Sequence, residues 1–79
     1  MYKAACLQAG RVDDAIARYQ KTLEISPDFA DAHNNLGNAY RSRGRIADAV
    51  AEYRRALAID PANTRARTNL ADTLRASGG

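Results

Sequence analysis

The sequence is poor in aromatic residues and in long apolar runs. It contains one Phe, no Trp and four Tyr, and charged residues interrupt every apolar segment after a few positions. No segment is therefore long enough to span a bilayer. The N-terminal stretch MYKAACLQAG lacks the long apolar core of a secretory signal, so we expect a cytoplasmic protein that does not bind membranes.

Residues suited to catalysis or metal binding are also scarce. Cys6 is the single cysteine, which excludes an internal disulfide and a metal site with several cysteine ligands. His33, the single histidine, has Gly37 four residues further on, where a second metal ligand would be needed. The sequence contains no Ser/His/Asp set, no phosphate-binding loop and no pair of catalytic carboxylates. We therefore predict a non-catalytic protein without a metal or another cofactor.

The charge balance is mildly basic, with a net charge of +3 from twelve basic and nine acidic residues. By itself this is weak support for an acidic partner. A nucleic-acid surface would interleave exposed aromatic and basic residues. The tyrosines fall mostly on apolar stripes, so nucleic-acid binding is not predicted.

What the sequence does contain is a repeat. When it is shifted by 34 residues against itself, 15 of the 45 paired positions are identical. The composition would give about five identities by chance. Paired residues include Gly10 with Gly44 and Pro27 with Pro61. The chain is therefore built from a repeated unit of 34 residues.

Each unit is predicted to contain two helices, because its apolar residues recur with a 3.6-residue period. Gly10 and Gly44 are each expected to end a helix in the left-handed conformation, and Pro27 and Pro61 end the helix that follows. Small residues such as Gly37 and Ala71 are expected where two helices cross closely. The prediction is an all-α fold of five antiparallel helices, near 2–9, 12–26, 30–43, 46–59 and 64–77.

This pattern resembles the tetratricopeptide repeat family. The signature positions of a complete repeat at 30–63 are occupied by Leu36, Gly37, Tyr40, Ala49, Tyr53, Ala56 and Pro61. The resemblance implies a right-handed superhelical stack of helix pairs, with about 2.3 repeats in a single domain over 1–79. It places a partial repeat at 1–29 and the first helix of a further repeat at 64–79.

The resemblance also implies a concave groove, lined by the first helix of each repeat, that binds proteins or peptides. The stretch NNLGNAY places three amides, Asn34, Asn35 and Asn38, on one side of such a helix, and we expect that side to be open. An extended peptide could be held by its backbone there. The candidate groove residues are Asp31, Asn34, Asn35, Asn38, Arg41, Arg65, Asn69, Asp72 and Arg75.

Several alternatives stay open. The amides could instead bond to neighbouring groups and stabilise the stack. Asn35 and Asn69 also match the asparagine ladder of O-linked N-acetylglucosamine transferases, so the chain could select substrates for a catalytic domain outside it. The carboxylate clamp of chaperone-binding members is matched only at Asn35 and Arg65. Finally, uncovered end helices could produce a homo-oligomer.

Overall fold

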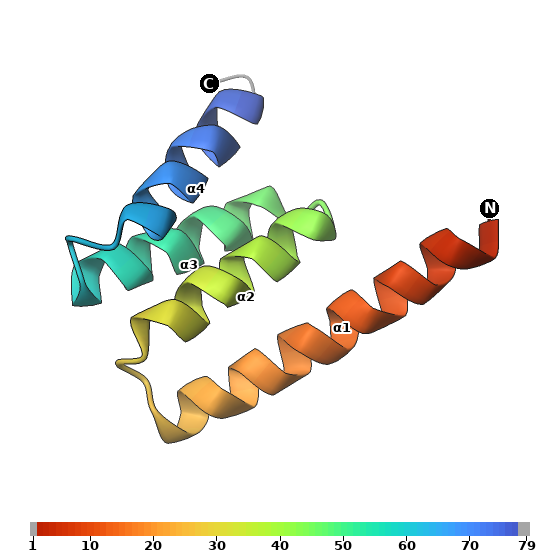
Figure 1. Ribbon diagram of the computed structural model, residues 1–79, viewed down its shortest axis with the longest axis horizontal. Helices are drawn as coiled ribbons and strands as arrows, with labels where there is room; N and C mark the ends of the chain where they lie inside the picture. Colours follow the sequence, from red (N-terminus) through yellow and green to blue (C-terminus); the bar gives the residue numbers. More distant parts are fainter. Residues whose placement is uncertain (1, 78–79) are drawn as a thin grey trace.

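The computed structural model describes residues 2–77, with side chains from Gly10 onward. Four helices follow one another along the chain and form an all-α fold (Figure 1). Their bounds are α1 Tyr2–Ile25, α2 Ala30–Ser42, α3 Ile46–Ile59 and α4 Thr64–Ala76. The expected helices near 30–43, 46–59 and 64–77 are thus confirmed to within one residue. In the described part of the chain, none of the helices combines the length and apolar character needed to cross a membrane.

The prediction of five helices is wrong at its N-terminal end. The segments 2–9 and 12–26 form one helix, α1, which runs straight through Gly10 (Figure 1). A glycine inside a helix is unfavourable by only about 1 kcal/mol relative to alanine. The alanine-rich sequence before it favours continued helix. A left-handed glycine is needed only where the chain reverses, and it does not reverse at Gly10.

Gly44 does reverse the chain, as its position in the repeat predicts. Its φ is 78°, and it is the one described glycine with a positive φ. The Gly44 amide donates to the Arg41 carbonyl at 3.0 Å, and the Arg45 amide donates to the Tyr40 carbonyl at 2.9 Å. These two bonds define a Schellman motif, which satisfies the last carbonyls of α2 and directs the chain into α3.

The hydrophobic core surrounds α2, which packs against α1 on one side and α3 on the other (Figure 1). Gly37 allows the closest approach, because a Cβ atom there would lie 2.6 Å from Cε1 of Tyr53. Tyr53 is completely buried. The core cluster consists of Ile16, Leu36, Ala39, Tyr40, Ala49 and Tyr53. This packing fixes α2 relative to α3, and α4 then packs against α3.

Candidate peptide-binding groove

A hollow of about 310 Å³ lies between α2 and α4. It is lined by Asn34, Asn35, Asn38, Thr64, Arg65, Thr68 and Asn69. A second hollow, of about 290 Å³, lies between α1 and α2 and also includes Asn35 and Asn38. The two hollows meet at these asparagines, and we call the combined surface the groove.

Asn34 does not lie open in the groove as expected. Its exposed fraction is only 4%. The Asn69 side-chain amide donates to Asn34 Oδ1 at 2.9 Å, which joins α4 to α2. The expectation that all three amides are open is therefore wrong for Asn34, because α4 packs across it. For this pair, the alternative in which amides stabilise the stack is the one that the contacts support.

Asn38 and Asn35 are both exposed, but they differ in their bonding. Asn38 Oδ1 accepts a hydrogen bond of 2.6 Å from the Tyr53 hydroxyl, so it satisfies a buried tyrosine of α3. No described residue forms a side-chain hydrogen bond with Asn35, which faces both hollows. Asn35 thus presents to the groove a donor and an acceptor that have no partner among the described residues.

The charged candidates are divided between the groove and its surroundings. Arg65 is exposed and lines the hollow. Asp72 and Arg75 form an ion pair at 2.6 Å on the exposed surface of α4. Asp31 accepts a long hydrogen bond of 3.4 Å from Asn63, and Arg41 is half-buried. The hollow between α2 and α4 therefore brings together Asn34, Asn35, Asn38, Arg65 and Asn69. Asp31, Arg41, Asp72 and Arg75 do not line it.

Two threonines that line the hollow, Thr64 and Thr68, are absent from the predicted set. Thr68 occupies the position equivalent to Asn34 in the next repeat unit, so the 34-residue shift could have identified it. Thr64 comes directly after Asn63, whose side chain caps α4 by accepting a hydrogen bond from the Ala66 amide at 3.1 Å. Thr64 begins α4 as predicted, but its place in the hollow depends on how α4 packs beside α2, which the sequence pattern does not define.

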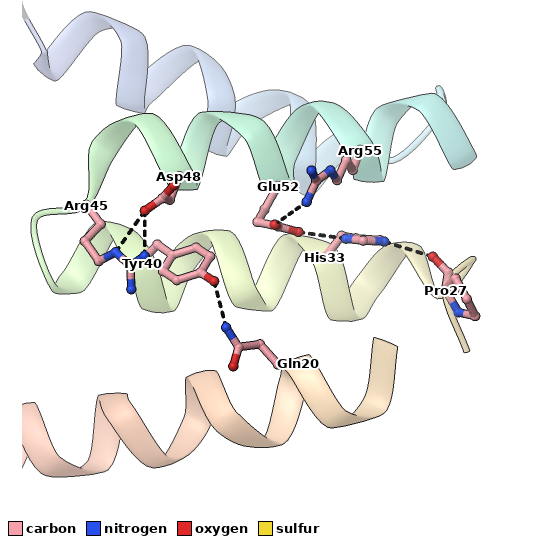
Figure 2. A network of polar contacts seen from close by, with 8 residues as sticks. All are labelled: Gln20, Pro27, His33, Tyr40, Arg45, Asp48, Glu52 and Arg55. Atoms are coloured by element: carbon pink, nitrogen blue, oxygen red, sulfur yellow. Dashed lines mark hydrogen bonds and ion pairs between the residues drawn. The ribbon is translucent and has the colours of Figure 1, made fainter. Parts of the chain in front are cut away.

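Behind the groove, a polar network joins α2 to α3 (Figure 2). His33 Nε2 donates to the Pro27 carbonyl at 2.9 Å, since a carbonyl oxygen can only accept. His33 Nδ1 lies 2.8 Å from Glu52 Oε1, and one proton between these atoms completes the bond. Arg55 pairs with the other Glu52 oxygen at 2.8 Å. No metal site is predicted at His33, and neither the repeat nor the apolar period indicates Glu52, 19 residues further on, as its partner.

Tyr40 of α2 forms polar contacts with α1 and with the turn that leads into α3 (Figure 2). Its hydroxyl accepts a hydrogen bond of 3.0 Å from the Gln20 side chain of α1. The Arg45 guanidinium lies 4.5 Å from the centre of the Tyr40 ring and pairs with Asp48 at 2.8 Å. Such a cation–π contact adds to the packing at the turn between α2 and α3. These contacts hold the walls of the groove without occupying it.

Consecutive helices built from a 34-residue repeat, with a polar hollow between α2 and α4, are typical of a helical-repeat protein. The family described as tetratricopeptide repeat matches residues 5–64, and the chain belongs to this family. Its repeats are generally non-catalytic protein-interaction modules. No curated protein gives a significant sequence match to the chain.

Proposed function

We propose that the chain binds an extended peptide, or an extended segment of a partner protein, along the groove. The observation that supports this most strongly is the hollow between α2 and α4, in which the exposed side chains of Asn35 and Arg65 make no hydrogen bond or ion pair with any described residue. Polar groups that are already held on rigid helices can bind a ligand with little loss of conformational entropy.

The two side chains have different proposed roles. The Asn35 carboxamide donates to a peptide carbonyl and accepts from a peptide amide, so it binds the backbone of a ligand of any sequence. Arg65 pairs with a carboxylate of the ligand. Asn34 and Asn69 hold each other and fix the distance between α2 and α4. The proposed ligand is therefore an extended segment with at least one acidic group.

A peptide-array screen with the 79-residue chain tests the proposal. Binding to a set of extended acidic peptides is expected, and Asn35→Ala and Arg65→Ala should each weaken it at least about tenfold. Arg54→Ala, at an exposed position of α3, is the matched control and should bind as the wild type does. Binding that survives both groove substitutions would place the ligand elsewhere and contradict the proposal.

Protein is preferred to nucleic acid as the partner because the rings of Tyr40 and Tyr53, on α2 and α3, are buried. Tyr40 and Tyr53 are 7% and 0% exposed, and both hydroxyls are hydrogen-bonded within the chain. Stacking of bases on exposed aromatic rings is what single-stranded nucleic acid binding needs. Among the described residues, Tyr19 lines the hollow between α1 and α2 but is half-buried, and Phe29 is exposed but lines neither hollow of the groove. The basic residues could attract phosphates, but no row of exposed rings accompanies them in the described part of the groove.

The second proposal is a substrate-selecting region of a glycosyltransferase similar to O-linked N-acetylglucosamine transferases. It is favoured by Asn35 and Asn69, which occupy equivalent positions one repeat apart. An asparagine ladder needs both amides to face the ligand, however, and Asn69 donates to Asn34. The plain interaction module therefore agrees better with the contacts. Reading the parent gene beyond Gly79 distinguishes the proposals, since a transferase would continue into a long α/β region.

A further inference from the structure

The C-terminal half of α1 repeats the sequence of α3 but not its burial. Seven positions are identical when 11–25 is aligned with 45–59. Ala49 and Tyr53 of α3 are completely buried, and Tyr53 packs against Gly37 of α2. Their counterparts Ala15 and Tyr19 are only half-buried. A hollow of about 380 Å³ lies over them, lined by Arg11, Asp14, Ala15, Arg18 and Tyr19. This face of α1 therefore resembles the buried face of α3 in sequence, but in the described part of the chain no helix packs on it as α2 packs on α3.

α4 likewise has residues that are more exposed than their counterparts in α2. Leu74 occupies the position of Tyr40 and is 39% exposed, whereas Tyr40 is 7% exposed. Ala71 occupies the position of Gly37 and is also exposed. In α2, Gly37 packs against Tyr53 of α3, and Tyr40 is buried in the core cluster that also contains Ala49 and Tyr53 of α3. In α4, no described residue buries them. α1 and α4 lie on opposite sides of the α2–α3 pair, so they cannot cover each other (Figure 1).

We propose that α4 of one copy of the chain packs on the α1 face of a second copy, in the way that α2 packs on α3. The α2–α3 pair supplies the template, because each residue of the proposed interface has a counterpart in it. The Tyr53–Asn38 hydrogen bond would become one from the Tyr19 hydroxyl to the Asp72 carboxylate. The two surfaces differ, so the association is head-to-tail and leads to open chains of copies.

Three residues that differ from the template predict that this interface is weak. The buried His33–Glu52 pair is replaced by Arg67 and Arg18, which bring two like charges together. Gly37 is replaced by Ala71, although a Cβ atom at Gly37 would meet the Tyr53 ring at 2.6 Å. α4 and α1 of the two copies must therefore lie slightly further apart than α2 and α3 do. These mismatches also identify the changes that would strengthen association.

The test is sedimentation velocity of the 79-residue chain over a range of concentrations. The wild type should show a mass that rises above 8.6 kDa at high micromolar concentration. Arg18→Glu replaces the repulsion by an Arg67–Glu attraction and should lower the apparent Kd at least about tenfold. Arg54→Glu, which makes the same charge change on the exposed surface of α3, is the control and should leave the Kd unchanged.

Leu74→Arg supplies the opposite test, because it places a charge in the proposed interface at an exposed position. It should return the chain to a monomer, while Ala58→Arg on exposed α3 should not. Circular dichroism confirms that each variant keeps its helices. A mass of one chain for both wild type and Arg18→Glu would overturn the proposal. So would association that Arg18→Glu and Arg54→Glu change equally, or association that Leu74→Arg leaves intact.

Discussion

Gly37 and Tyr53 determine how closely α2 and α3 approach. The Tyr53 ring occupies the space that a side chain on Gly37 would need, and its hydroxyl continues past the backbone of α2 to Asn38. One glycine thus permits both the close packing and the hydrogen bond. Asn38 is held by that bond in the wall of the groove, so core packing and groove geometry depend on the same contact.

Gly37→Ala should lower the free energy of unfolding by about 1–3 kcal/mol, because the new Cβ atom overlaps the buried ring. Gly10→Ala is the matched control: nothing lies within 4 Å of a Cβ atom at Gly10, and it is inside α1. That change should stabilise the chain by up to about 1 kcal/mol. Urea denaturation of both variants measures the difference. A Gly37→Ala variant as stable as the wild type would show that the ring is free to move.

Glu52→Ala should destabilise the fold by about 3 kcal/mol, because it leaves buried His33 without its partner. Asp48→Ala removes a carboxylate from the same helix, but there the ion pair with Arg45 is solvent-exposed. Its effect should stay below about 1 kcal/mol. Thermal unfolding followed by circular dichroism compares the two. Equal losses would mean that the buried network contributes no more than a surface ion pair.

Among the helices, α2 and α4 are each the first helix of a repeat unit, but their N-termini are capped differently. Asn63 caps α4 through its side chain, whereas Phe29, at the same position before α2, makes no side-chain cap. Cap bonds satisfy amides that a helix start leaves unpaired. α2 is packed on both sides and tolerates the missing cap. α4 is packed mainly against α3 and depends more on its own cap.

Asn63→Ala should therefore destabilise α4 by about 1 kcal/mol. Phe29→Asn introduces the missing side chain before α2 and should stabilise the chain by a similar or smaller amount. Hydrogen exchange provides the measurement, since opening of α4 should become more frequent while the amides of α2 stay protected. If Asn63→Ala exposes α2 and α4 amides equally, the helices unfold as one unit and the cap has no local effect.

The sequence predicts the helices where several independent signals coincide. For α3, the apolar stripe, the glycine before it and the proline after it agree, and its bounds were found to within one residue. For α1, Gly10 alone signalled an end, and a single glycine does not break a helix unless packing rewards the reversal. Repeat alignment thus identifies equivalent residues, but it does not establish that each is equally packed.

For the groove, the residue types were predictable and their bonding was not. The 34-residue period places Asn35 and Asn69 at equivalent positions, yet Asn35 is open and Asn69 is bonded to Asn34. The difference arises because α4 packs across Asn34, a contact between residues far apart in the sequence. His33 and Glu52 illustrate the same limit. Both are replaced by arginine in the neighbouring units, so their pairing is particular to one repeat.

For the whole molecule, we propose that the groove, and not the outer surface, receives the partner. The groove crosses α1, α2 and α4, and Asn35, which lines both of its hollows, has no side-chain partner among the described residues. The outer side of α3 carries exposed residues such as Arg54 and Ala58. These two surfaces belong to the same small domain, so one experiment can compare them directly.

The most direct measurement is an NMR titration of the isotope-labelled chain with an extended acidic peptide. Binding in the groove predicts shifts of the Asn35 side-chain amide and of the Arg65 and Thr68 backbone amides, which saturate with one Kd. The chemical shifts of the Arg54 and Ala58 backbone amides should not change. Shifts confined to the outer side of α3, with Asn35 and Arg65 unchanged, would show that the peptide binds outside the groove.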